Sequence, residues 1–144
     1  MAPATKKIPL RWNVLIAEDD LNSRAQLLKA LNHAAKCVVV DNGKQAIETY
    51  RKAIKKKSRF DFVLLDVSMP GPDGFEVLRA IRAEEEKNSA ASLKPTRIIM
   101  VTSYRDSLMS MYNMGWDEYI TKPVETDKLV LKMKTMAGFD SLKS

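Results

Sequence analysis

The fold is decided by the stretch Phe62-Val63-Leu64-Leu65-Asp66-Val67-Ser68-Met69-Pro70-Gly71-Pro72-Asp73-Gly74. Its first four residues form an apolar run with the length and composition of a buried strand, and turn-forming residues follow Asp66. Asp66 therefore stands where a buried strand reaches the surface. Because ligands of α/β proteins bind at the carboxyl ends of the strands, Asp66 is a candidate nucleophile or metal ligand.

Short apolar runs on both sides of this stretch predict further strands, and segments with helical spacing of apolar residues alternate with them. The predicted strands are Trp12 to Ala17, Cys37 to Val40, Phe62 to Asp66, Arg97 to Thr102 and Glu118 to Thr121. The predicted helices are Leu21 to Ala35 with Asp20 or Asn22 as cap, a segment from Asn42-Gly43 through Ile54, Gly74 to Arg82, a segment opened by Asp106 or Ser107 and closed by Gly115, and a last helix capped by Thr126 and ended by Gly138. The polar segment from Glu84 to Lys94 is predicted to be an exposed loop.

Five strands that alternate with five helices predict an α/β fold, a doubly wound five-stranded parallel sheet with helices on both faces. Right-handed crossovers leave few compact strand orders. Of these, the order 2-1-3-4-5 has its switch point between the first and third strands. The polar strand from Glu118 to Thr121 then lies at an edge of the sheet. In this order Glu18, Asp19 and Asp66 share one crevice.

The composition is that of a single soluble globular domain. The chain has 144 residues, of which 45% are hydrophobic and 29% charged, which is usual for an ordinary folded domain. Since no apolar stretch approaches the roughly 20 residues that span a bilayer, and the start lacks a signal-peptide core, a cytoplasmic protein without membrane contact is predicted. Residues 1–11 are interpreted as a polar leader, 12–138 as the domain and 139–144 as a short tail.

The formal charge of +6 does not by itself indicate a nucleic-acid partner. Much of this charge lies between Arg51 and Arg59 at a predicted helix end, where cations offset the negative end of the helix dipole. No recognition-helix pattern or aromatic stacking platform accompanies the cluster, so no nucleic acid is predicted for this chain. The lone Cys37 lies in an apolar run, which favours a reduced compartment and a core role.

The carboxylates at the predicted crevice indicate a divalent metal. Three carboxylates without a counterion would repel one another, so a stable cluster at neutral pH needs a cation. Oxygen ligands without nearby His or Cys suit Mg²⁺ or Mn²⁺ far better than zinc. The single His33 lies in or just after the first predicted helix, away from the strand ends, so neither a zinc site nor a Ser-His-Asp triad is predicted.

Lys122 and Thr102 complete a set of groups suited to phosphoryl transfer. Pro123 restricts the preceding Lys122 to extended geometry, which holds this lysine at the end of the last strand. Thr102 places a hydroxyl at the end of the fourth strand. In-line phosphoryl transfer needs an anionic acceptor, a metal and fixed donors, and Asp66 is the natural acceptor.

At these positions the chain resembles the response-regulator receiver domains of two-component phosphorelays. The matching stretches are Val14 to Asp20, Asp41 to Gly43, Val63 to Gly74, Met100 to Ser103 and Gly115 to Pro123. The Asp-x-x-Met-Pro-x-x-Asp-Gly element is highly specific when an acidic pair precedes it and Lys-Pro follows. The resemblance covers roughly Val14 to Gly138 and implies a flavodoxin-like fold. The long polar segment before the fourth strand is similar to receivers fused to hybrid histidine kinases.

The resemblance implies a role for each residue of the crevice. Asp66 is expected to be the phosphoacceptor, with Mg²⁺ held by Asp66, Glu18, Asp19 and the backbone carbonyl of Ser68. The resemblance further implies that Lys122 and Thr102 contact the phosphoryl group and that Tyr119 is an aromatic switch. In the implied mechanism Thr102 moves toward the phosphoryl group, Tyr119 turns inward, and the face made by the fourth helix, fifth strand and fifth helix changes shape.

The resemblance also implies the partners. A histidine kinase or a histidine phosphotransfer protein is expected to supply the phosphoryl group, and the same face allows a homodimer. The domain is expected to be a signalling module rather than an enzyme, promoting only its own phosphorylation and dephosphorylation.

Two departures from the family pattern and two alternatives remain. Glu18 replaces the commoner Asp with a longer carboxylate. Tyr104 and Ser68 occupy positions that tune attack of water on the acyl phosphate, and bulky Tyr104 is expected to slow hydrolysis. One alternative is a degenerate receiver that acts only as an interaction module. The other is an Asp-nucleophile phosphatase of the haloacid dehalogenase type, which needs a second Asp where Ser68 stands.

Overall fold

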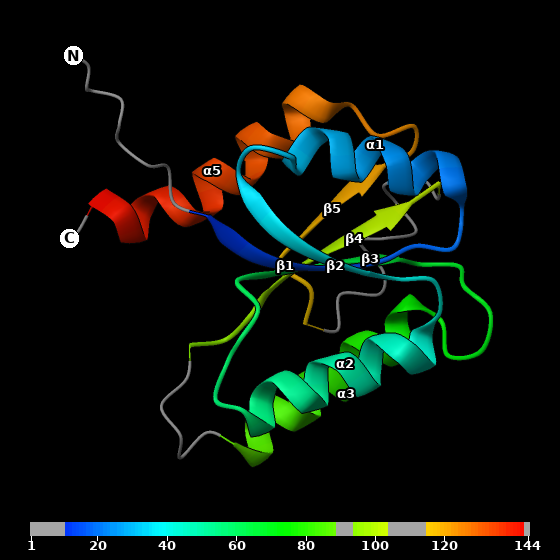
Figure 1. The fold of residues 1–144 in the computed structure, drawn as a ribbon, viewed down its shortest axis with the longest axis vertical. Helices are drawn as coiled ribbons and strands as arrows, with labels where there is room; N and C mark the ends of the chain where they lie inside the picture. Colours follow the sequence, from blue (N-terminus) through cyan, green and yellow to red (C-terminus); the bar gives the residue numbers. More distant parts are fainter. Residues whose placement is uncertain (1–10, 89–93, 104–114, 143–144) are drawn as a thin grey trace.

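A five-stranded parallel sheet forms the middle layer of the molecule (Figure 1). The computed structural model describes residues 11–88, 94–103 and 115–142, with only the backbone of 139–142. The strands are β1 (Trp12–Ala17), β2 (Ala35–Val40), β3 (Phe62–Asp66), β4 (Arg97–Thr102) and β5 (Glu118–Thr121), in the order β2-β1-β3-β4-β5. The predicted fold class, the strand order and the edge position of β5 are therefore confirmed.

Helices cover both faces of this sheet, as predicted. The described helices are α1 (Leu21–Leu31), α2 (Gly43–Lys55), α3 (Gly74–Lys87) and α5 (Thr126–Leu142). In Figure 1, α1 and α5 lie together on one face, and α2 and α3 lie together on the other. No helix among the described residues has the length and apolar character needed to cross a membrane. The predicted helix from Asp106 or Ser107 to Gly115 lies almost wholly outside the described residues.

The central strand β3 supplies apolar side chains to a core on each side of the sheet. All five of its residues are buried. Val63 and Leu65 pack with α2 and α3 in one core, and Phe62 and Leu64 pack with α1 and α5 in the other. Because successive side chains of a strand point to opposite faces, an unbroken apolar run is what a strand covered on both faces requires.

Side-chain caps fix the starts of three helices near the carboxyl ends of the strands. Asp20 accepts a hydrogen bond from the Ser23 amide at 2.8 Å, which confirms Asp20 as the cap of α1. Asn42 caps α2 in the same way, and Asp73 forms a capping box with Glu76 at the start of α3. Such caps satisfy amides that the first helical turn leaves free, so the helices begin directly after the strand-end loops.

The boundary between α1 and β2 differs from the prediction. The first helix ends at Leu31 rather than Ala35, and β2 begins at Ala35 rather than Cys37. The Ala34 amide bonds the Leu31 carbonyl at 3.0 Å, and the Trp12 amide bonds the Ala34 carbonyl at 2.9 Å. Pairing with β1 therefore draws this segment into the sheet, although Ala35 also fits the helical spacing.

The third helix is longer than predicted, because α3 continues past Arg82 to Lys87. The expected loop from Glu84 was wrong in its first four residues. The Glu84 carboxylate pairs with Arg51 at 2.9 Å, and Glu85 accepts a hydrogen bond from the Thr96 amide at 2.7 Å. These polar residues are helical because partners on other elements satisfy them.

The last helix also differs at both ends. It includes Thr126 as its first residue and passes through Gly138 to Leu142. A glycine inside a helix costs about 1 kcal/mol relative to alanine. This cost is not large enough to end α5 at Gly138. The predicted tail from residue 139 therefore begins within α5.

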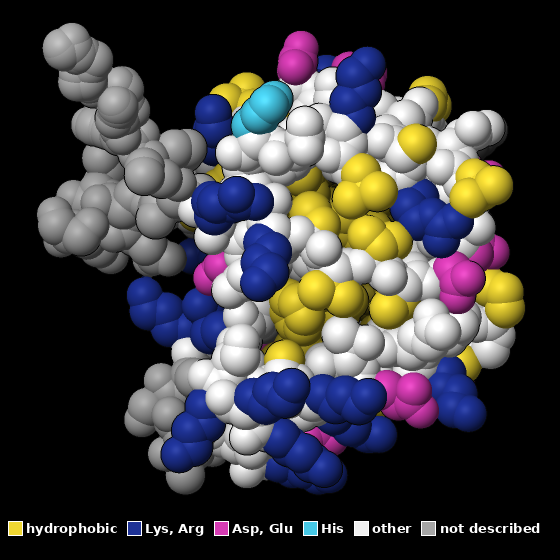
Figure 2. Space-filling model, viewed as in Figure 1, with side chains coloured by type: hydrophobic (Ala, Val, Ile, Leu, Met, Phe, Trp, Pro, Cys, Tyr) yellow, Lys and Arg dark blue, Asp and Glu magenta, His cyan; other side chains and the backbone are white. Residues whose placement is uncertain are grey.

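The strand β2 forms the open edge of the sheet opposite β5. On this side of the molecule Figure 2 shows apolar side chains between the two helical layers, with Lys and Arg around them. Val38 of β2 is 39% exposed and Leu28 of α1 is 37% exposed. Lys36 is exposed, and the Arg11 guanidinium donates to the Ala35 carbonyl at 3.5 Å. This edge is thus apolar in part and cationic at its start.

Candidate functional site

Three carboxylates meet at the carboxyl ends of β1 and β3. Glu18 and Asp19 follow β1, Asp66 ends β3, and one carboxylate oxygen from each lies within 4.8 Å of the others. They meet because β1 and β3 are neighbouring parallel strands, with Ala17 opposite Leu65. Glu18 is 0% and Asp66 4% exposed, whereas Asp19 is open to solvent. The acidic cluster is therefore buried at its base and accessible from one side.

Lys122 brings a positive charge into this cluster from the end of β5. Its Nζ lies 3.2 Å from Glu18 Oε1 and 3.3 Å from Asp66 Oδ1. The Lys122 amide donates to the Thr102 carbonyl at 2.7 Å, which continues the β4–β5 pairing by one residue. Among the described residues, Lys122 pairs with two of the three clustered carboxylates, so one ammonium stands against three negative charges.

One oxygen of Glu18 has spare capacity to accept a ligand. Glu18 Oε2 accepts hydrogen bonds from Lys122 Nζ at 3.2 Å and from the Asp20 amide at 3.1 Å. Oε1 is buried and also lies within ion-pair distance of Lys122 Nζ, but no described group donates a hydrogen bond to it. Lys122 therefore attracts Oε1 as a charge, while its hydrogen bond to Glu18 goes to Oε2. A buried oxygen without a donor favours binding of a cation there.

The excess of negative charge appears in the pKa values. Burial raises the pKa of Asp66 to about 6, aided by a hydrogen bond that protonated Asp66 can donate to Glu18 and by the negative charge of Glu18, although Lys122 opposes this shift. Burial and then Asp66 raise the pKa of Asp19. Burial alone would lower the pKa of Lys122, but the charges of Asp66 and Glu18 outweigh burial and raise it. One ammonium thus does not neutralise the cluster, and a divalent cation would.

The loop after β3 holds Asp66 in place. The Ser68 amide donates to Asp66 Oδ1 at 3.3 Å, and the Gly74 amide donates to the Val67 carbonyl at 2.9 Å. A Cβ on Gly74 would collide with the Asp66 carbonyl oxygen and stand 2.8 Å from Val67 Cα. Glycine at this position therefore lets α3 begin directly against the end of β3.

The remaining predicted site residues lie on β4 and β5. Thr102 ends β4 and is 1% exposed, one residue beyond Val101, the partner of Asp66 in the sheet. Tyr119 is half-buried on β5, two residues before the end of that strand. The predicted position Tyr104 lies outside the described residues.

Sequence reasoning missed the aromatic partner of Tyr119. The Trp116 and Tyr119 rings form an edge-to-face pair, with centroids 5.4 Å apart and planes at 86°. The only sequence signal was an aromatic residue three positions before Tyr119. Because Trp116 precedes β5 in a segment without regular structure, that spacing does not place the two rings together.

Comparison with known proteins identifies relatives over most of the chain. Residues 14–140 match the response regulator receiver domain family. The chain is 30% identical over 128 residues to the transcriptional regulatory protein ResD of Bacillus subtilis, covering 85% of this chain and 47% of ResD. It is 32% identical over 128 residues to the sensor protein GacS of Pseudomonas syringae pv. syringae, covering 85% of this chain and 14% of GacS. The chain thus spans less than half the length of either relative.

Solved structures with the same fold include receiver domains. The co-crystal structure of the Saccharomyces cerevisiae phosphotransfer protein Ypd1 with the receiver domain of Ssk1 gives a TM-score of 0.73 at 26% identity, covering 89% of this chain and 90% of that chain. The receiver domain of the histidine kinase PA1611 from Pseudomonas aeruginosa, solved with magnesium in its active-site cleft, gives 0.71 at 22% identity, covering 89% and 98%. With the family match over residues 14–140, these findings show that the chain belongs to the response regulator receiver domain family.

Proposed function

We propose that this chain is a phosphoacceptor in a two-component phosphorelay and that Asp66 receives the phosphoryl group from a phosphohistidine donor. The proposal rests chiefly on the buried Asp66 carboxylate, which lies at a strand end beside Glu18, Asp19 and Lys122. The family is a signalling module. We therefore propose reversible phosphorylation rather than turnover of a metabolite.

The proposed transfer uses Asp66 as nucleophile. A carboxylate oxygen of Asp66 attacks the phosphorus of the phosphohistidine, the P–N bond breaks, and its electron pair remains on the imidazole nitrogen. The product is an acyl phosphate on Asp66 and a free histidine on the donor. Lys122 and Thr102 would donate to the phosphoryl oxygens, since Thr102 ends β4 and Lys122 follows the neighbouring β5 at the same end of the sheet.

The acidic cluster is the proposed site for Mg²⁺, or Mn²⁺ in its place. Carboxylates of Glu18, Asp19 and Asp66, with the backbone carbonyl of Ser68, would supply oxygen ligands of the kind these ions prefer. The excess negative charge and the Glu18 oxygen without a donor support this assignment. When bound, the ion would offset the charge on the phosphoryl oxygens.

The proposed response to phosphorylation lies on β5 and α5. Thr102 would move toward the phosphoryl group and Tyr119 would turn inward. The face made by the predicted fourth helix, β5 and α5 would then change shape. The proposed partners are a histidine kinase or a histidine phosphotransfer protein. The structural likeness to a receiver that was solved with Ypd1 supports the latter. A cytoplasmic location, a domain that begins at residue 12 and a homodimer through the same face also belong to the proposal.

Phosphoryl uptake tests the proposed function directly. With acetyl phosphate and Mg²⁺, intact-mass spectrometry is expected to show one added phosphoryl group on the parent protein and none on Asp66→Asn. Removing Mg²⁺ with EDTA should abolish uptake. The matched control is Asp127→Asn, because Asp127 is exposed on α5 and is not one of the clustered carboxylates, and this variant should be phosphorylated like the parent.

The two alternatives give different outcomes. An interaction module without phosphoryl chemistry would take up no phosphoryl group under any of these conditions. A phosphatase would release phosphate steadily from many substrates, but Ser68 stands where the general acid of that mechanism is needed.

Replacing Tyr104 by Ala is expected to shorten the life of the acyl phosphate. We propose that the Tyr104 ring shields the phosphoryl group from water, so its loss should speed hydrolysis roughly 3- to 10-fold, about 1 kcal/mol in the barrier. Decay of the phosphorylated form after acetyl phosphate is removed would measure this rate. Tyr104→Phe keeps the ring and should keep the parent rate, whereas unchanged decay in Tyr104→Ala would refute shielding.

A further inference from the structure

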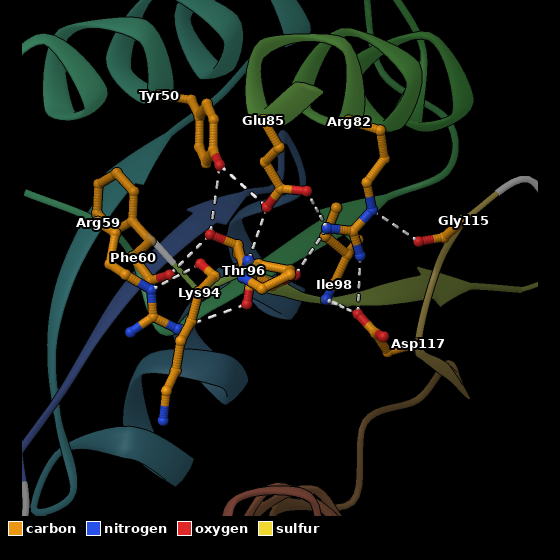
Figure 3. A network of polar contacts seen from close by, with 11 residues as sticks. Tyr50, Arg59, Phe60, Arg82, Glu85, Lys94, Thr96, Ile98, Gly115 and Asp117 are labelled. Carbon is orange, nitrogen blue, oxygen red and sulfur yellow. Dashed lines mark hydrogen bonds and ion pairs between the residues drawn. The ribbon is translucent and has the colours of Figure 1, made fainter. Parts of the chain in front are cut away.

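A polar network lies at the amino ends of β4 and β5, whereas the acidic cluster lies at the carboxyl ends of the strands. Arg82 of α3 makes contacts with several residues of this network (Figure 3). The Arg82 guanidinium donates to the carbonyls of Gly115 at 2.9 Å and Thr96 at 2.8 Å. It also pairs with the carboxylates of Glu85 at 2.7 Å and Asp117 at 2.9 Å. A single side chain therefore ties α3 to the segments that precede β4 and β5.

The partners of Arg82 are themselves fixed by the sheet. The Asp117 carboxylate accepts from the Ile98 amide at 2.7 Å, and the Asp117 amide donates to the Ile98 carbonyl at 2.8 Å. Glu85 accepts from the Thr96 amide at 2.7 Å and from the Tyr50 hydroxyl at 3.2 Å. Charge-assisted bonds of this kind are among the stronger ones in proteins, and the planar guanidinium sets their directions. The segment before β5 is thus held in one place.

Gly115 is suited to this contact. Its φ of +115° is a conformation that residues with a side chain rarely adopt, and a Cβ there would stand 3.3 Å from Arg82 Cγ. A larger residue would therefore strain the backbone and push the arginine side chain away from the Gly115 carbonyl.

Trp116 lies between the two residues that Arg82 holds on this segment. Its ring is half-buried and meets Tyr119 edge to face, with centroids 5.4 Å apart. Both rings pack against the core on the side of α2 and α3. Because Arg82 fixes the residues on either side of Trp116, it also limits where the Trp116 ring can lie.

We infer that Arg82 is a positioning residue for the switch, because it keeps Trp116 against Tyr119 so that a turn of Tyr119 displaces the Trp116 ring. Arg82 acts at the start of β5, whereas Lys122 follows the other end of that strand. The inference rests on the proposed function, in which phosphorylation of Asp66 turns Tyr119. It adds a second aromatic residue, part of it at the surface, that moves with the state of the site.

The test uses Trp116 fluorescence in a Trp12→Phe background, where Trp116 is the only tryptophan. Acetyl phosphate with Mg²⁺ is expected to change the Trp116 emission, while intact-mass spectrometry measures phosphoryl uptake in the same sample. In Arg82→Gln the emission change should fall at least about threefold at equal phosphoryl uptake. The glutamine amide lacks the charge and the several N–H donors of the guanidinium, so it cannot replace the contacts of Arg82.

Arg59→Gln is the matched control. Arg59 also bonds near the start of β4, to the Lys94 carbonyl and to Asp61, each at 3.0 Å, but it bonds no described residue of the segment before β5. Both variants are expected to lower the free energy of unfolding, which urea unfolding would measure. If Arg82 only stabilised the fold, the two variants would show the same Trp116 emission change on phosphorylation. The inference predicts instead that Arg59→Gln keeps the full emission change and Arg82→Gln does not.

The outcomes separate this inference from the proposed function. A full emission change in phosphorylated Arg82→Gln, or no change in the phosphorylated parent, overturns the inference and leaves the phosphoacceptor role intact. A parent that takes up no phosphoryl group contradicts both. Should Arg82→Gln not fold, Gly115→Ala perturbs the same contact from the other side, and a full emission change there overturns the inference equally.

Discussion

Gly74→Ala is expected to lower the free energy of unfolding by about 3 kcal/mol or more, a large effect for a single methyl group. The added Cβ would meet the carbonyl oxygen of Asp66 and the Cα of Val67, both of which are backbone atoms. Backbone in the middle of a sheet yields less easily than a flexible side chain. Relief would require α3 to move away from the end of β3, and urea unfolding followed by circular dichroism would measure the loss.

The same substitution should also slow phosphoryl uptake by the protein that remains folded, because the collision falls on the residue that carries the nucleophile. Gly138→Ala is the control, since a Cβ at that helical position would meet no described atom within 4 Å beyond its chain neighbours and the adjacent backbone of its own helix. Alanine there should raise stability by up to about 1 kcal/mol. Equal stability of Gly74→Ala and the parent would show that α3 can shift without cost.

Asp66→Asn is expected to raise the free energy of unfolding at neutral pH, in the absence of divalent cations, by up to about 3 kcal/mol. The folded-state pKa of Asp66 is about 6, above the usual 3.8, so the folded protein binds this proton more tightly than the unfolded chain does. Protonated Asp66 therefore stabilises the folded state, fully so below pH 3.8, and this contribution is lost as the pH rises through about 6. Asparagine does not ionise, so the variant escapes this loss.

The pH dependence is the sharper part of this prediction. The difference between parent and Asp66→Asn in urea unfolding should shrink as the pH falls from neutral to about 4, where the parent carboxyl becomes protonated. Mg²⁺ should narrow the difference at neutral pH by stabilising the parent more. A constant difference, or a variant less stable than the parent at neutral pH, would mean that Lys122 already neutralises Asp66. Asp127→Asn should show neither trend.

The strand ends were predictable because their signals are local. The central strands are buried on both faces, so each reads as an unbroken apolar run, and the first polar residue after it marks the carboxyl edge of the sheet. Parallel pairing then brings these ends together regardless of loop details. Glu18, Asp19, Asp66 and Lys122 could thus be placed in one cluster before any contact was known.

The polar network at the amino ends of β4 and β5 was not predictable from the sequence, because its contacts join residues far apart in the chain. Arg82 and Asp117 are 35 residues apart, and their pairing depends on how β4 and β5 align. The same cause explains the unexpected last turn of α3. Glu84 and Glu85 look like solvent-exposed loop residues until Arg51 and the Thr96 amide are placed beside them.

The open edge at β2 bears on how the protein behaves at high concentration. Among the described strands β2 is outermost and its valines are partly exposed, and an outer strand of this kind can pair with a strand from another molecule, a common route to aggregation. Here the Arg11 guanidinium donates to the Ala35 carbonyl, and Lys36 adds an exposed positive charge to the same strand. Charges on an outer strand disfavour pairing with a strand of another molecule, so we expect the cationic start of β2 to reduce aggregation through this edge.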